Sequence, residues 1–135
     1  MTHYHLVSRI AIYILSVVLI CFGIFHFLYP RDLFVYVPLW LVGGMVWIYV
    51  VGGVFILVGL SFLTNQYVKF TSYLLAVILI LFILSVHVPN FINAGDKEMR
   101  QFALMNILKD TAITGFALHI AASAHHQHLH FEDAD

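Results

Sequence analysis

The chain has 135 residues, of which 62% are hydrophobic and only 10% charged. So short a chain cannot hide that much apolar surface in a soluble core, because small domains leave a large part of their surface outside, and we expect lipid to be the solvent for much of it. Six Lys and Arg against seven Asp and Glu give a net charge of −1, which argues against a nucleic-acid partner. The single cysteine, Cys21, excludes an intrachain disulfide and a Cys-x-x-Cys motif.

The first predicted helix covers residues 8–29. A helix that crosses the bilayer core needs roughly 20 apolar residues, and an uncharged run of about that length lies between Arg9 and Arg31. Because this run is as long as a full span and no small-x-small cleavage pattern follows it, we expect it to be retained rather than cleaved as a secretory signal.

The next two predicted helices are delimited by prolines and polar residues. A long uncharged run is cut by Pro38 and by the polar residues 64–66 to a helix over 39–63. The third helix starts near Phe70. Proline lacks a backbone donor and disfavours helix in the residue before it, so Pro89 should end this helix near His87.

The fourth predicted helix is the least apolar, because it contains Lys109 and Asp110, but its other residues are mostly apolar and read as helix. Short connections make consecutive helices antiparallel neighbours. We therefore predict an all-α fold, an integral membrane four-helix bundle in up-down-up-down order, as a single domain over residues 1–123. Its spans are expected at residues 8–29, 39–63, 70–88 and 102–123. Residues 124–135 form a His-rich, acidic tail that we expect to be flexible.

Polar side chains are predicted to gather at one membrane face, where the first and third helices end and the second and fourth begin. This candidate ligand-binding cluster comprises His26, Trp40, His87, Asn106, Lys109 and Asp110. No catalytic residue is assigned. A lipid-facing carboxylate has no way to recover its insertion cost, so we expect Asp110 to face the bundle interior, bonded to Asn106 or to a residue of the first or third helix. A structural polar stripe and a ligand or proton site both remain open.

The sequence supports three cofactor hypotheses. His26 and His87 lie at similar depth, as a bis-histidine haem site requires, although each can equally cap a helix end. Trp40 and Trp47 lie on one helix face and offer a stacking platform for a quinone, although an interfacial aromatic belt explains them as well. Weak metal candidates lie in the tail, where the histidine spacing matches no closed tetrahedral site. They are His125, His126, His128 and His130.

Several short motifs, in this order and spacing, carry a family resemblance that reaches to about Ser123. They are the stretch 23–30 (GIFHFLYP), Tyr36-Val37-Pro38 with Trp40, Gly52-Gly53 with Gly59, His87-Val88-Pro89-Asn90, and Asn106-Ile107-Leu108-Lys109-Asp110 with Gly115. In these residues the chain resembles the DoxX/DoxD-like family of small four-helix membrane proteins. The resemblance implies a bacterial inner (cytoplasmic) membrane protein that is tied to redox or stress pathways.

The leading functional hypothesis is an accessory subunit or scaffold for a membrane redox or stress-response partner, with no enzymatic activity of its own. The expected partners are the lipid bilayer, a redox protein and further copies of the chain. The first alternative is a quinone-reactive or haem-binding electron carrier that uses the polar cluster. The second is a small proton-coupled transporter that uses Lys109 and Asp110, although four short helices leave little room for alternating access without oligomerisation.

Overall fold

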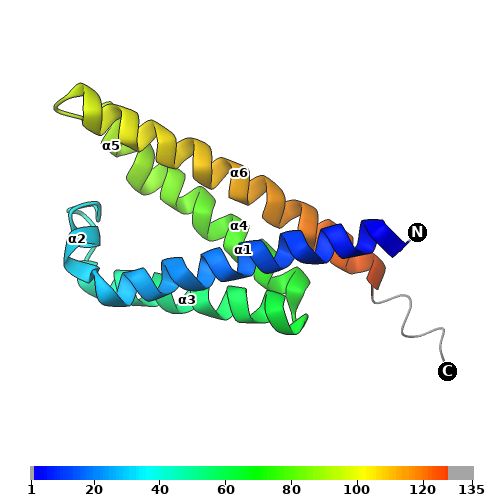
Figure 1. Ribbon diagram of the computed structural model, residues 1–135. Coiled ribbons are helices and arrows are strands. Elements are labelled where there is room, and N and C mark those ends of the chain that lie inside the picture. The colour runs from blue at the N-terminus through cyan, green and yellow to red at the C-terminus, as the bar shows by residue number, and fades with distance from the viewer. Residues whose placement is uncertain (1, 128–135) are drawn as a thin grey trace. The chain divides into compact units, whose positions relative to one another are not determined.

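The computed structural model describes the backbone of residues 2–127 and the side chains of residues 6–124, and every regular element in these ranges is helical (Figure 1). This confirms the all-α prediction. The chain divides into two compact units, Met1–Val68 and Lys69–Asp135. The elements are α1 (Thr2–Leu28), α2 (Pro30–Phe34), α3 (Gly44–Thr64), α4 (Val68–Phe82), the π-helical turn η1 (Ile83–His87), α5 (Val88–Ile92) and α6 (Lys97–Gln127).

Three helical segments of the described chain are long and apolar enough to cross a membrane. They are Leu6–Leu28 within α1, Gly44–Thr64, which is α3, and the continuous segment Val68–Ile92 formed by α4, η1 and α5. Such lengths match the roughly 20 residues that a span requires. The fourth predicted span lies in α6, a helix of 31 residues that is not among these three segments.

In the first unit, α1 packs lengthwise against α3 through small residues (Figure 1). A Cβ atom added to Gly59 of α3 would lie 2.9 Å from the carbonyl oxygen of Ser16 and 2.6 Å from a side-chain carbon of Ile20. Ser16 is fully buried here, and its hydroxyl donates to the carbonyl oxygen of Ile12 at 2.7 Å. Glycine is thus required for the close approach of the two backbones, as is usual between helices in membranes.

The prediction that the second helix begins at Leu39 is wrong, because α3 begins at Gly44. The residues before it form turns, one of them closed by a hydrogen bond from the backbone N–H of Leu41 to the Pro38 oxygen. Gly43 then adopts a left-handed conformation with φ of 86°, which interrupts any continuous helix from the preceding residues. The sequence analysis also did not predict the short helix α2, which begins at Pro30, where proline suits a first helical position.

The prediction that the third helix ends near His87 is also wrong, because the chain remains helical through Pro89 to Ile92. The π-helical turn η1 precedes the proline, and the N–H of Val88 donates to the oxygen of Ile83, five residues back. Pro89 therefore falls in the first turn of α5, where its missing donor does no harm. The helix restarts beyond it, with the Asn93 N–H donating to the Pro89 oxygen at 2.9 Å.

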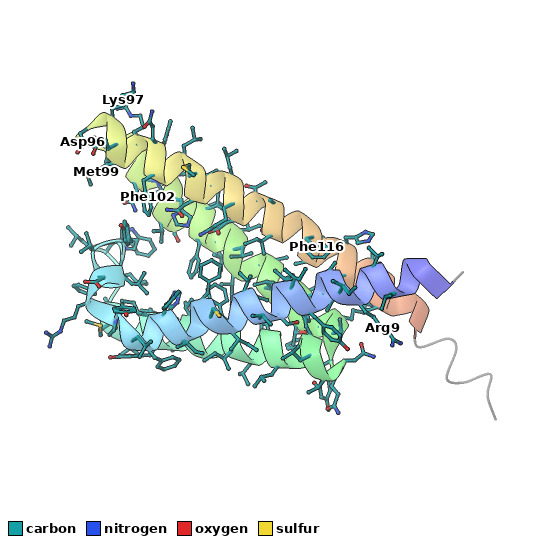
Figure 2. All side chains as sticks on the ribbon, in the orientation of Figure 1. Arg9, Asp96, Lys97, Met99, Phe102 and Phe116 are labelled. Atoms are coloured by element: carbon teal, nitrogen blue, oxygen red, sulfur yellow. The ribbon has the colours of Figure 1, made fainter. Side chains whose placement is uncertain are left out.

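The helix α6 begins at Lys97 rather than at Phe102, because Asp96 caps its first turn (Figure 2). The Asp96 carboxylate accepts a hydrogen bond from the backbone N–H of Met99 at 2.8 Å, which satisfies one of the unpaired donors at a helix start. At its other end α6 continues to Gln127, so the first residues of the predicted flexible tail are helical. Within the second unit, η1 and α5 pack against α6.

Candidate polar site on helix α6

One face of α6 is buried and built from small and polar residues. The small and polar members are Ala103, Asp110, Thr114, Ala117, Ala121 and Ala124, with Ile120 buried beside them, and their spacings of three, four and seven residues are those of a single helix face. Asp110 is 4% exposed and is the one buried residue with an ionisable side chain in the part of the chain that the structure describes. Its burial agrees with the expectation that this carboxylate faces inward.

The Asp110 carboxylate is paired with His87, which is the last residue of η1. Nε2 of His87 lies 2.9 Å from Oδ2 of Asp110, and the two side chains are 16% and 6% exposed. An ionised carboxylate only accepts hydrogen bonds, so the histidine donates from Nε2 when Asp110 is ionised. A bond to a charged acceptor is among the stronger kinds, and here it joins the third predicted helix to the fourth.

Lys109 and Asn106 complete the cluster on the exposed side of α6. Nζ of Lys109 lies 3.5 Å from Oδ1 of Asp110, and it donates to Oδ1 of Asn106 at 3.3 Å. The Lys109 side chain is 45% exposed, as expected of a long cation whose stem lies along an apolar surface while its head reaches out. Of the partners predicted for Asp110, its carboxylate therefore uses the third-helix histidine, while Asn106 joins the cluster through Lys109.

The His87 ring keeps one nitrogen available. Its described interactions consist of the contact with Asp110 through Nε2, so Nδ1 has no partner among the described residues. When the ring is neutral and Nε2 carries the proton, Nδ1 presents a lone pair that can accept a hydrogen bond or bind a metal. A carboxylate that orients a histidine in this way is the arrangement found behind many histidine bases and metal ligands.

The π-helical turn and a buried serine are the features that the sequence analysis missed. Single π turns are rare and occur often at functional sites, and η1 ends at the histidine of the pair. The signal in the sequence was a proline directly after an apolar helix, which was interpreted as a helix end. Ser72 on α4 is fully buried, and its Oγ has no hydrogen-bond partner among the described residues.

The structure brings together four of the six predicted site residues, namely His87, Asn106, Lys109 and Asp110, all in the second unit. His26 and Trp40 belong to the first unit. Nδ1 of His26 lies 2.6 Å from the carbonyl oxygen of Phe22, and its ring meets the Phe55 ring edge-on at 5.5 Å. Trp40 lies in the connection between α2 and α3 and is 69% exposed.

The tail histidines of the metal hypothesis lie outside the described side chains, and the haem hypothesis is constrained by the contact that His87 makes with Asp110. Within the described residues, no group of three or more His, Cys, Asp or Glu side chains is placed to hold a metal ion. The tail histidines at 125, 126, 128 and 130 lie outside the residues whose side chains are described. For haem, Nε2 of His87 already bonds Asp110. Iron would have to use Nδ1, which is closer to the backbone and therefore more crowded.

Comparison of the chain with protein-family models, with curated proteins and with solved structures finds no match. The DoxX/DoxD-like resemblance therefore stays a prediction that depends on the motifs quoted from the sequence. The geometry around Asp110 is the firmest basis for a functional proposal.

Proposed function

We propose that this chain is an integral membrane protein of the DoxX/DoxD-like type that serves as an accessory subunit or scaffold for a membrane redox or stress-response partner. The main support for the proposal is that both oxygens of the buried Asp110 carboxylate have partners. Oδ2 is paired with His87, and Oδ1 lies beside Lys109. The contact between Oδ2 and His87 joins η1 to α6 through a buried carboxylate, as a structural component requires. The resemblance adds the redox context and the bacterial inner membrane.

The proposal includes a fourth span in α6 and an up-down-up-down bundle. With 31 residues, α6 exceeds the length that a bilayer core requires. Its polar residues lower its mean hydropathy. However, Asp110 is buried and paired with His87, and the long side chain of Lys109 can extend toward the headgroups. A helix can cross lipid with such residues when they face protein partners or reach the interface.

The test is purification of the tagged full-length chain in polymer-bounded native lipid discs, followed by an optical spectrum and mass spectrometry. We expect a partner in fixed ratio that carries a flavin, haem or other redox centre. Asp110→Leu should reduce this complex because it unpairs His87. Gly115→Ala is the matched control and should leave the complex intact, because an added Cβ would meet nothing within 4 Å apart from its own helix. A pure chain without any redox partner would contradict the scaffold proposal.

A second candidate function is quinol oxidation, and the available Nδ1 of His87 favours it. A quinol hydroxyl can donate a hydrogen bond to this nitrogen, and Asp110 stabilises the imidazolium that forms when the proton is accepted. The two electrons would pass to the redox partner, and the second proton would go to water at the membrane face. Organic extraction of the purified chain followed by chromatography tests this candidate, because a bound quinone lost in His87→Gln would support it over a purely structural pair.

A further inference from the structure

The connection between α2 and α3 is the most apolar exposed segment that joins two helices in the first unit. We call residues 35–43 the apolar loop. Its exposed large side chains include Leu39 at 105%, Val42 at 91%, Val35 at 77% and Trp40 at 69%. No Asp, Glu, Lys or Arg occurs between Asp32 and Lys69, so the loop contains no charged group that would favour contact with water.

The apolar loop has a defined conformation. The N–H of Leu41 donates to the Pro38 oxygen at 3.0 Å, and the indole Nε1 of Trp47 on α3 donates to the Val42 oxygen at 2.9 Å. Phe34 of α2 packs on Gly44 at the start of α3, where an added Cβ would lie 2.6 Å from the phenylalanine ring. The loop therefore holds its apolar side chains outward on a hydrogen-bonded frame.

The position of the loop in the chain sets its depth. It follows α1, whose apolar segment ends at Leu28, and precedes α3, whose apolar segment begins at Gly44. A loop between two membrane spans begins and ends at the membrane surface. Irregular backbone is not tolerated in the hydrocarbon core, whereas large apolar side chains are unfavourable in water. The headgroup and upper acyl region satisfies both constraints.

We propose that the apolar loop is an interfacial membrane wedge, with Leu39, Trp40 and Val42 inserted among the lipids and its partner the bilayer itself. Tryptophan is enriched at this depth because its ring is apolar while its N–H still reaches polar groups. Arg31 and Asp32 of α2, both exposed, are separated from the loop only by Leu33 and Phe34 and provide charges for the headgroup side. The inference rests on α1 and α3 crossing the membrane, and not on the redox role.

The experiment uses tryptophan fluorescence of the full-length chain in phosphatidylcholine vesicles, because the protein contains two tryptophans. Trp47→Gln leaves Trp40 as the single probe and keeps a side-chain N–H that can donate to the Val42 oxygen. Bromine atoms on the acyl chains quench at contact, so lipids brominated near the glycerol end and lipids brominated near the chain middle report depth. We expect the Trp40 emission to be blue-shifted from that of N-acetyltryptophanamide and to be quenched more by the shallow bromines than by the deep ones.

A mid-span probe separates failure of the wedge from failure of the membrane topology. In the chain without native tryptophans, Leu57→Trp places an indole at a 65% exposed position well inside α3, and deep bromines should quench it most. If this probe is quenched as expected while Trp40 is quenched by aqueous iodide and not by brominated lipid, the wedge is wrong and the spans stand. If both probes are accessible to iodide, the spans themselves are wrong.

Charge substitution provides the matched comparison. Leu39→Glu, made together with Trp47→Gln, should shift the Trp40 emission to the red and reduce quenching by brominated lipid, because the new charge draws the loop toward water. Gln66→Glu, an exposed substitution beyond the opposite end of α3, adds the same charge away from the loop and should leave the depth of Trp40 unchanged. A blue-shifted Trp40 that escapes brominated lipid and reddens when the protein is diluted in lipid would identify a second copy as the occupant and overturn the proposal.

Discussion

Gly23 of α1 and Gly52 of α3 lie in direct backbone contact. A Cβ atom added to Gly23 would come within 2.6 Å of the Gly52 carbonyl oxygen and 2.5 Å of the Ile56 side chain. Such distances are shorter than van der Waals contact allows, and one of the two obstacles is backbone that cannot rotate away. The helix pair of the first unit therefore depends on the absence of a side chain at this position.

Gly23→Ala should destabilise the first unit, and Gly53→Ala is its matched control. Both substitutions gain the same helix propensity, but nothing lies within 4 Å of a Cβ at Gly53. We expect Gly23→Ala to lower the free energy of unfolding by about 1–3 kcal/mol relative to Gly53→Ala, which is the range for overpacking a tight contact. Unfolding in mixed micelles with increasing sodium dodecyl sulfate measures both. Equal stability of the two variants would show that the helices can separate without loss.

Asp110→Leu and Asp110→Asn should differ in stability. Asparagine keeps an oxygen that accepts from Nε2 of His87, whereas leucine leaves that donor without its partner. We expect Asp110→Leu to lower the free energy of unfolding by about 1–3 kcal/mol, the cost of a polar group left unpaired. Asp110→Asn should fold and insert normally but weaken the association that the site serves. Thermal unfolding in detergent and membrane fractionation test this pair of variants. If both variants unfold and insert as the parent does, the polar cluster does not stabilise the fold.

The burial of Asp110 was predictable from the sequence, while its geometry was not. The energetic cost of a carboxylate in lipid is a property of the residue and its depth, so it can be argued without coordinates. The choice of His87 as partner depends on the rotation of one helix about its axis. A π-helical turn changes that rotation, and η1 lies directly at this histidine.

Helix ends were predicted less well than helices, for three local reasons. Apolarity locates a span but not its ends, so the left-handed Gly43 at the start of α3 was passed over. Pro89 was interpreted as a stop, although proline is equally suited to the first turn of a new helix. The Asp96 cap was a readable signal, since aspartate favours the position before a helix, but the search for an apolar run placed the start at Phe102.

Asp96→Ala should fray the first turn of α6. The side chain of Asp96 satisfies the Met99 N–H, and alanine has no group to replace it. We expect a loss of about 1 kcal/mol in unfolding free energy, typical of a lost N-cap, and faster hydrogen exchange of the Met99 amide. Asp96→Ser, whose hydroxyl can accept the same hydrogen bond, should restore most of the protection. If serine exchanges as fast as alanine, the cap does not hold this turn.

Pro89→Ala should weaken the pairing of His87 with Asp110. An alanine at this position regains an N–H that can donate four residues back, and it removes the ring that clashes with a regular α-helix. The chain can then replace the π-helical turn η1 by α-helix, which changes the rotation of the segment by about one residue, roughly 100°.

Imidazole nitrogen NMR of the 15N-histidine-labelled chain measures this effect, with the His87 signals assigned by their loss in His87→Gln. The parent should show Nε2 protonated and hydrogen-bonded and Nδ1 without a proton when the ring is neutral. Pro89→Ala should move these signals toward those of an unpaired imidazole, in the direction that Asp110→Leu moves them. Pro30→Ala is the control, because Pro30 also lies in the first turn of a short helix but belongs to the first unit and follows no π turn. Unchanged His87 signals in Pro89→Ala would mean that the contact with Asp110, and not the proline, holds η1 in its π form.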